Sequence, residues 1–221
     1  MTASYDGQVR AFDYSKNIVL AYAAHSAPVT SLCIVPSSAN EDGTSTIATA
    51  SQDLTAQISQ VTFGSTSEAS SSSKTLATLH LHTSPVSSVS SNSSGSHLLT
   101  SSWDGLIGLW DTSIPSSDEV PEPVLNERDR EGKKKRRKLQ REAEDEHGGR
   151  QAKRKAPLMV LKSHTGRVSK VIWVPEEKNK AYSCGFDSTV RLWNTEHGIC
   201  DHTIVSQSPL SFSFDFSLMV S

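Results

Sequence analysis

The stretch SWDGLIGLWD, residues 102–111, decides the fold, because three other segments of the chain repeat its pattern. These segments are SYDGQVRAFD at 4–13, SQDLTAQISQ at 51–60 and GFDSTVRLWN at 185–194. In all four, an aspartate stands six residues before a position that holds Phe12, Ser59, Trp110 or Trp193. A pattern that returns at a similar interval predicts one structural unit repeated along the chain.

A histidine precedes three of the four segments. His25, His82 and His164 lie 28, 22 and 23 residues before their aspartates, and each is followed by a short turn and an apolar alternation. The aspartates themselves are 47, 51 and 83 residues apart. The last interval falls to about 41 when a charged segment is set aside, close to the ~40 to 45 residues of a WD repeat.

The pattern resembles the WD repeat, and the resemblance implies an all-β fold, a β-propeller. Runs such as 29–35, 47–51 and 168–174 alternate apolar with polar or small residues, as half-buried strands do. Each blade is then a four-stranded antiparallel sheet, with the aspartate in the tight turn between its second and third strands. Asp104-Gly105 is the strongest of these turn signals.

The blade count predicts an incomplete propeller, because three His-to-Trp units and the end of another are too few to close a ring. We expect a truncated form with open sheet edges. The expected parts are the end of a WD blade at 1–15, a blade with a Ser-rich loop at 25–81, a blade at 82–111, a basic and mostly disordered insert at 112–157, a blade at 158–205 and an atypical tail at 206–221.

The resemblance to WD-repeat proteins implies a hydrogen-bonded chain of four groups in each blade. These groups are the turn aspartate, the upstream histidine, a hydroxyl two residues before the aspartate, and the tryptophan. Only one blade carries the full set. By blade, the candidates are His25, Ser51 and Asp53, with Ser59 in place of the tryptophan; His82, Ser102, Asp104 and Trp110; and His164, Asp187 and Trp193, with Gly185 in place of the hydroxyl.

The same residue types could form a catalytic triad, with Ser102, His82 and Asp104 as its members. No G-x-S-x-G motif surrounds any serine, and a catalytic site has no reason to recur every 40 residues or so. No histidine pair has metal-ligand spacing, and no cofactor motif is present. We therefore expect an architectural role for these residues, with no enzyme activity, metal or cofactor.

Composition predicts an intracellular chain. Its 221 residues contain no apolar stretch of bilayer-spanning length, and the N-terminus lacks the apolar core of a secretory signal, so no membrane contact is expected. Cys33, Cys184 and Cys200 form no C-x-x-C pair, which indicates reduced thiols, the first two packed in strands.

A basic segment carries most of the positive charge. Residues 126–155 hold 13 of the 22 Lys and Arg and 7 of the 24 Asp and Glu, so this segment is +6 while the remainder is −8. Two clusters resemble a bipartite nuclear localisation signal: Lys133, Lys134, Lys135, Arg136, Arg137 and Lys138, then Lys153, Arg154 and Lys155. The alternative is a solvated loop with no partner, and any RNA contact should be electrostatic, because no aromatic residue lies in 119–155.

The order of these elements resembles one family more closely than the repeat class as a whole. The chain is similar to the WD-repeat ribosome-biogenesis proteins of the PeBoW type in the order YDGQVRAFD, a degenerate blade, TSSWDGLIGLWDT, a basic insert, LKSHTGRVSKVIW and YSCGFDSTVRLWNTEHG. The resemblance implies a non-catalytic scaffold in maturation of large-subunit ribosomal RNA. Its implied partners are pescadillo-type and block-of-proliferation-type subunits and pre-ribosomal particles, with RNA contacted through the basic insert, in the nucleus, nucleolus and nucleoplasm.

A second hypothesis stays open at this point. The chain could be a generic WD-repeat adaptor, such as a substrate receptor of a ubiquitin ligase, because propellers support many functions. The two hypotheses differ in whether ribosomal RNA accompanies the protein partners. An enzyme is the weakest candidate, since nothing in the sequence supplies an activated nucleophile.

Overall fold

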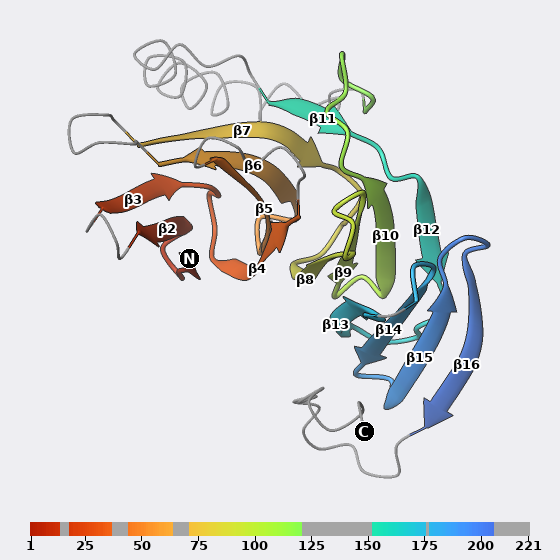
Figure 1. Ribbon diagram of the computed structural model, residues 1–221. Coiled ribbons are helices and arrows are strands. Elements are labelled where there is room, and N and C mark those ends of the chain that lie inside the picture. The colour runs from red at the N-terminus through yellow and green to blue at the C-terminus, as the bar shows by residue number, and fades with distance from the viewer. Residues whose placement is uncertain (14–17, 37–43, 64–70, 121–151, 176, 206–221) are drawn as a thin grey trace, which may run out of the picture.

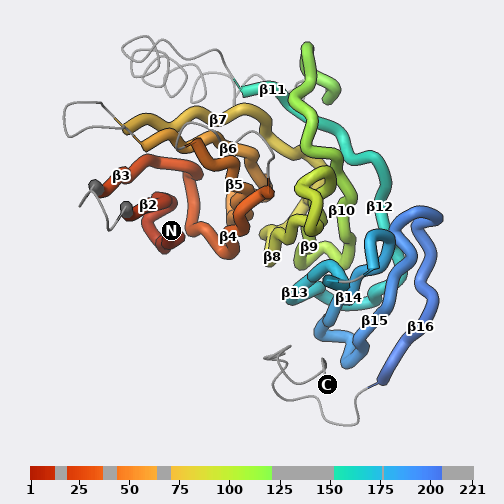
Figure 2. The backbone as a smooth tube through the Cα atoms, viewed as in Figure 1, coloured from red at the N-terminus to blue at the C-terminus, as the bar shows by residue number. Residues whose placement is uncertain are grey.

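The computed structural model describes the chain except for residues 14–17, 37–43, 64–70, 121–151, 176 and 206–221. The described residues form sixteen strands in four sheets and no helix. The sheets follow one another in chain order around an arc, from the N-terminal sheet to the C-terminal one (Figure 1). The backbone tube in Figure 2 shows the same succession.

The first sheet has three strands, in the order β1-β2-β3. They are β1 (Thr2–Ala3), β2 (Gln8–Asp13) and β3 (Ile18–Ala23), and both pairs are antiparallel. The sequence places the end of this blade at residue 15, but β3 extends the sheet to Ala23.

The second sheet has five strands, four of which are consecutive and antiparallel. They are β4 (Val29–Val35), β5 (Thr44–Ser51), β6 (Ala56–Thr62) and β7 (Ser72–Leu79), with β11 (Lys153–Lys155) as the fifth. Strand β11 pairs in parallel with the outer strand β7, although it comes from the end of the basic insert.

The third sheet has the order β12-β10-β9-β8. Its strands are β8 (Val86–Ser91), β9 (His97–Ser102), β10 (Leu106–Asp111) and β12 (Met159–Lys162). The basic insert therefore lies within this blade, between its third and outer strands. This corrects the expected boundary at residue 158, because β12 completes the blade that begins at His82.

The fourth sheet is antiparallel in chain order. Its strands are β13 (Val168–Trp173), β14 (Lys180–Gly185), β15 (Thr189–Asn194) and β16 (Ile199–Val205). The expected tail at 206–221 and most of the insert lie outside the described residues.

The tight turns require a left-handed backbone conformation at the residue that follows each aspartate. Gly7 and Gly105 have φ of +79° and +82°, and Leu54 and Ser188 occupy the corresponding position with φ of +74° and +58°. Glycine adopts this left-handed conformation at little cost, whereas leucine and serine are strained in it. The turn therefore keeps its geometry in all four sheets, even where the sequence does not favour it.

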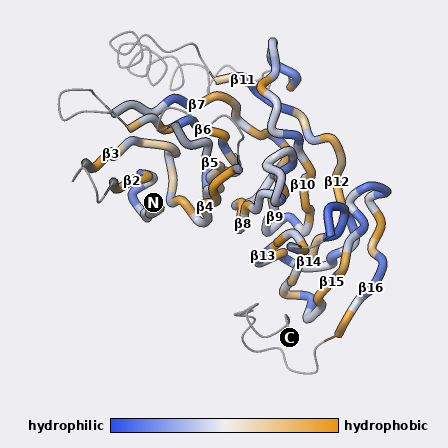
Figure 3. The backbone as a smooth tube through the Cα atoms, viewed as in Figure 1, coloured by the Kyte–Doolittle hydropathy of each residue, from blue (hydrophilic) through white to orange (hydrophobic). Residues whose placement is uncertain are grey.

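The core lies between neighbouring sheets. Leu98 packs in the cluster between the second and third sheets, and its chain neighbour Leu99 packs in the cluster between the third and fourth. Ile47 and Ala48 divide in the same way between the clusters on the two sides of the second sheet. Successive side chains of a strand point to opposite faces, so each inner sheet is buried on both sides. Figure 3 shows hydrophobic segments along the strands of the sheets.

Hydrogen bonds also join the innermost strands of successive sheets. The hydroxyl of Thr30 donates to the carbonyl of Val86, and the hydroxyl of Ser87 donates to the carbonyl of Val168 at 2.7 Å. The same contact thus recurs from one sheet to the next. The repeated antiparallel sheets confirm the all-β, incomplete WD-repeat propeller predicted from the sequence.

Candidate functional site

The third sheet contains a complete example of the repeated polar network. His82 Nδ1 lies 3.0 Å from Asp104 Oδ2, and His82 Nε2 lies 2.9 Å from the hydroxyl of Thr100. The indole N–H of Trp110 donates to the same hydroxyl at 2.9 Å. Trp110 and Thr100 are fully buried. Gly108 leaves room for this contact, because a Cβ there would lie 2.8 Å from the indole nitrogen.

The chemistry of the donors fixes the direction of the network. An indole N–H can only donate, so the Thr100 oxygen accepts from Trp110, and the hydroxyl proton remains available to donate to His82 Nε2. A neutral imidazole that accepts at Nε2 carries its proton on Nδ1, where it donates to Asp104. Each polar group then has a partner, which a buried network requires.

The fourth sheet repeats this arrangement with a serine. His164 Nδ1 lies 2.9 Å from Asp187 Oδ2, and His164 Nε2 lies 2.6 Å from Ser183 Oγ. Trp193 donates to Ser183 Oγ at 2.7 Å. The fourth sheet therefore carries a complete network, although the sequence predicts that its hydroxyl is missing.

The second sheet carries a shorter network. His25 Nδ1 lies 2.9 Å from Asp53 Oδ2, and His25 Nε2 lies 2.9 Å from Thr49 Oγ1. Ser59 stands where the other two sheets have tryptophan, and its hydroxyl lies 3.5 Å from that of Thr75. This network therefore ends at Thr49.

The bridging hydroxyl is four residues before the aspartate, not two, so the predicted roles of Ser51 and Ser102 are wrong, and Gly185 does not leave its blade without a hydroxyl. Ser102 Oγ instead donates to the carbonyl of Ser84 at 2.9 Å and accepts from the N–H of Asp104. Ser51 makes the equivalent bonds to the chain before β4. These serines brace the turn. At Gly185 a Cβ would lie 2.8 Å from His164 Nδ1, so no side chain fits there.

Each turn carboxylate is held ionised by its hydrogen bonds. Burial would raise the pKa of Asp104, but the bonds from His82 and from the N–H groups of Leu106 and Thr83 outweigh it, and the pKa lies below its usual value. The same balance lowers the pKa of Asp53 and Asp187. Burial is the largest influence on His164 and lowers its pKa, despite the neighbouring carboxylate. In the fourth sheet these shifts favour a neutral His164 beside an ionised Asp187.

The order carboxylate, imidazole, hydroxyl also occurs in catalytic triads, but here the hydroxyl is inaccessible. Thr49 and Thr100 are fully buried, and Ser183 is 2% exposed. A substrate could reach these oxygens only if the sheets separated. In the described part of the chain, no group of three or more His, Cys, Asp or Glu side chains could hold a metal ion.

The cysteines are free thiols. Cys33 lies in β4 and Cys184 in β14, where Cys184 is buried. Burial raises the pKa of the Cys33 thiol to about 12, so this thiol stays protonated at neutral pH.

The second feature is the stem of the basic insert, by which we mean its described residues at the two ends, 112–120 and 152–157. Lys155 on β11 is 1% exposed, and its ammonium lies 2.6 Å from Asp111 Oδ1, at the end of β10. The same ammonium donates to the carbonyl of Ser113. The Lys155 bond holds the pKa of Asp111 below its usual value, against the opposite effect of burial. A buried charge needs such partners to be tolerated.

Hydrogen bonds from main-chain N–H groups join the two sides of the stem further along. The N–H of Arg154 donates to Asp118 Oδ1 at 2.9 Å, and the N–H of Ala156 donates to Glu119 Oε2 at 2.8 Å. The N–H of Glu119 donates to the carbonyl of Arg154 at 2.8 Å. The two ends of the insert are thus joined beside β7.

The predicted localisation residues fall into two groups. Lys153, Arg154 and Lys155 form β11, and Lys155 is part of the core, which excludes it as a contact residue while the strand is in place. Lys133 to Lys138 lie outside the described residues. The sequence does not predict strand β11, because Lys-Arg-Lys within a charged run is typical of solvent-exposed segments.

Comparison with known protein families identifies two WD repeats in the chain. The family model "WD domain, G-beta repeat" matches residues 73–111 and 155–194. Each match begins with the outer strand of one sheet and continues through the first three strands of the next. The sequence repeat is thus offset by one strand from the sheet.

The chain is also similar to curated proteins over nearly all of its length. Ribosome biogenesis protein YTM1 of Laccaria bicolor is 57% identical over 93% of this chain and 44% of that protein. The YTM1 protein of Coprinopsis cinerea is 53% identical over 95% of this chain and 45% of that protein. Ribosome biogenesis protein WDR12 homolog of Arabidopsis thaliana is 30% identical over 90% of this chain and 41% of that protein.

The chain is a WD-repeat relative of YTM1 and WDR12. It spans less than half the length of the curated relatives that it matches. No helix among the described residues is long and apolar enough to cross a membrane.

Proposed function

We propose that this chain is a non-catalytic scaffold in the biogenesis of the large ribosomal subunit, acting in the nucleus and nucleolus. The observation that carries the proposal is 57% identity to a ribosome biogenesis protein over 93% of the chain. Because the chain covers 44% of that relative, the role of the whole protein is extended to this chain only as a proposal.

The polar networks support a scaffold rather than an enzyme. Their hydroxyls are buried, and those of Thr100 and Ser183 are bonded to both a histidine and a tryptophan, so the repeated polar residues hold strands together. Recognition then falls to the surfaces of the sheets. We expect protein partners of the pescadillo type and the block-of-proliferation type, within pre-ribosomal particles.

The basic insert supports a nuclear location. Its six consecutive basic residues, 133–138, are typical of a nuclear localisation signal, and the +6 segment would be attracted to the phosphates of ribosomal RNA. Nothing described in the sheets favours the ligase adaptor over this function.

Affinity purification of the tagged chain, with RNA and proteins both identified, tests the proposal. We expect precursors of the large-subunit RNA together with the two partner classes. The matched control replaces Trp110 with phenylalanine, which removes the donor to Thr100 inside a blade and weakens the sheets without altering surface charge. Recovery of ubiquitin-ligase subunits without ribosomal RNA would refute the proposal in favour of the adaptor.

A further inference from the structure

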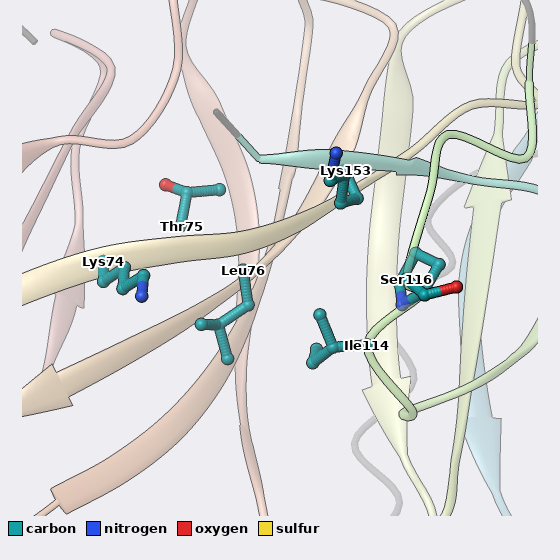
Figure 4. Close-up of a pocket in the computed structure, with 7 residues that line it drawn as sticks. Lys74, Thr75, Leu76, Ile114, Ser116 and Lys153 are labelled. Atoms are coloured by element: carbon teal, nitrogen blue, oxygen red, sulfur yellow. The ribbon is translucent and has the colours of Figure 1, made fainter. Parts of the chain in front are cut away.

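The hollow at the base of the insert stem has the chemistry of an anion site. It lies where β7, β11 and the 114–116 segment meet, and its volume is about 400 Å³. Figure 4 shows Lys74 and Leu76 on the same side of β7, with Lys153 above them on β11 and Ile114 beside them. The full lining is Lys74, Thr75, Leu76, Ile114, Pro115, Ser116 and Lys153.

The charges of the hollow are of one sign. Lys74 and Lys153 come from neighbouring parallel strands, and no Asp or Glu is among the lining residues. Within the described part of the chain, no ion pair involves either lysine; the nearby ion pair of the stem uses Lys155 and Asp111. Two ammonium groups without a carboxylate between them favour an anionic ligand.

The strand register spaces the two lysines for a ligand of some length. Lys153 is opposite Ala77, three residues along β7 from Lys74. Three residues of strand correspond to roughly 10 Å between their Cα positions, and lysine side chains are long enough to converge from there. A phosphate held by both ammonium groups would lie over the apolar side chains of Leu76 and Ile114.

These apolar side chains limit the choice of ligand. Ile114 is 46% exposed, and with Leu76 and Pro115 it forms an apolar wall beside the charges. An inorganic anion gains nothing from such a wall, whereas a ribose or base attached to the phosphate can cover it. The hollow also lies directly beside residue 152, where the basic segment rejoins the sheets.

We propose that this hollow binds a backbone phosphate of single-stranded RNA, with the attached nucleoside against Leu76 and Ile114. The inference rests on the proposed function, which brings the chain to ribosomal RNA. The site adds a defined RNA contact at the edge of the second sheet to the nonspecific electrostatic attraction between the basic insert and RNA. The site exists only while β11 is paired with β7, because Lys153 belongs to that strand.

The test measures binding of a fluorescent single-stranded oligouridylate to the purified full chain by anisotropy at several salt concentrations. The variant Lys74→Gln/Lys153→Gln should weaken binding about tenfold at low salt and reduce the slope of log K against log salt by about 1.4, or 0.7 for each lost contact. The matched control Lys162→Gln/Lys170→Gln removes the same charge at exposed positions of β12 and β13 and should change the slope far less.

A second variant tests the hollow itself. Ile114→Asp keeps both lysines and adds a carboxylate at a half-exposed position, so it should also weaken binding while the thermal transition stays near that of the wild type. Equal losses in the hollow and control variants would overturn the proposal, since binding would then depend on net charge alone. Displacement of the RNA by poly-glutamate at equal concentration would also overturn it, because the hollow would then favour an acidic peptide.

Failure of this inference can be told apart from failure of the proposed function. Oligonucleotide binding in solution needs no pre-ribosomal particle. If the purified chain binds RNA through Lys74 and Lys153 but does not recover ribosomal precursors from cells, the site stands and the biological role is wrong. If precursors are recovered and the hollow variants bind RNA normally, the role stands and the site is wrong.

Discussion

Trp110 Nε1 lies 2.9 Å from Thr100 Oγ1, and that same oxygen lies 2.9 Å from His82 Nε2. One hydroxyl thus joins the second strand of a sheet, its third strand and the connection that leads into its first strand. The bond is made in the core, where an unpaired polar group is costly. Removing the hydroxyl affects three elements together.

We therefore expect Thr100→Val to destabilise the chain more than Thr49→Val. Valine keeps the shape of threonine, but at position 100 it leaves both the Trp110 indole and His82 Nε2 without a partner, at about 1 to 3 kcal/mol for each group. At position 49 the affected group of the network is His25 Nε2, because Ser59 replaces the tryptophan. Urea unfolding followed by tryptophan fluorescence measures the difference.

Thr100→Ser serves as the control for this comparison, because it keeps the hydroxyl and loses only a methyl group. It should remain closer to the wild type than Thr100→Val does. Equal free energies of unfolding for Thr100→Val and Thr49→Val would show that the indole bond contributes no stability.

The sequence contains a second set of candidates for this hydroxyl, two residues before the predicted position. Thr49, Thr100 and Ser183 all stand four residues before their aspartates, whereas the position two residues before holds serine twice and glycine once. Both positions point to the same face of the strand, since they differ by two residues. Spacing alone could not show which of the two meets the histidine ring; that depends on how the chain enters the first strand.

Acid should weaken the fold through His164. Its pKa in the folded chain lies below the ordinary value of 6.5, chiefly because of burial, so the unfolded chain binds more protons as pH falls below about 6.5. The stability that His164 contributes is complete above that pH and is lost as pH falls toward its folded pKa. The loss cannot exceed about 1.4 kcal/mol per pH unit for this one group.

Urea midpoints at pH 7.5, 6.5 and 5.5 check this dependence. His164→Gln should be less stable at pH 7.5 but should lose less stability on acidification than the wild type. His202→Gln, at an exposed position on β16, should keep the wild-type slope. Equal slopes for the wild type and His164→Gln would contradict the buried neutral histidine.

The ion pair between Lys155 and Asp111 predicts an asymmetry between its two partners. Asp111→Asn leaves a fully buried ammonium without its carboxylate, which costs about 3 to 5 kcal/mol in comparable sites, whereas Lys155→Met removes the charge and keeps the volume. We expect Asp111→Asn to open the stem and Lys155→Met to leave it closed.

Hydrogen exchange of the β7 and β11 amides reports stem opening directly. The double variant Asp111→Asn/Lys155→Met is the control, because it removes both charges and should exchange more slowly than Asp111→Asn alone. Faster exchange in Lys155→Met than in Asp111→Asn would show that strand pairing depends on the lysine for some reason other than its charge.

Leu54→Gly should stabilise the turn of the second sheet. Leu54 has a φ of +74°, which strains an L-residue by about 1 to 2 kcal/mol, and glycine removes that strain at some cost in unfolded-state entropy. Leucine is 39% exposed there, so little apolar burial is lost. Gln52→Gly, two residues earlier where φ is not positive, should destabilise; thermal unfolding of both variants decides the matter.

The basic insert was harder to predict than the blades. Its composition identifies a charged segment after Trp110, but the pairing of Lys153 to Lys155 with β7 joins residues more than seventy positions apart. Parallel strand addition follows no local periodicity, and here it depends on a buried partner, Asp111, at the end of another strand. Only the three-dimensional arrangement reveals that one half of the presumed bipartite signal is folded.

Nuclear import should therefore depend on residues 133–138 alone. A receptor that binds a basic segment in extended form could engage Lys153 and Arg154 only after β11 leaves β7 and Lys155 leaves Asp111. With the chain fused to a carrier too large for passive diffusion, glutamine at all six positions from 133 to 138 should abolish nuclear accumulation. Lys153→Gln/Arg154→Gln should leave accumulation unchanged, and loss of accumulation in this second variant would restore the bipartite signal and require the stem to open during import.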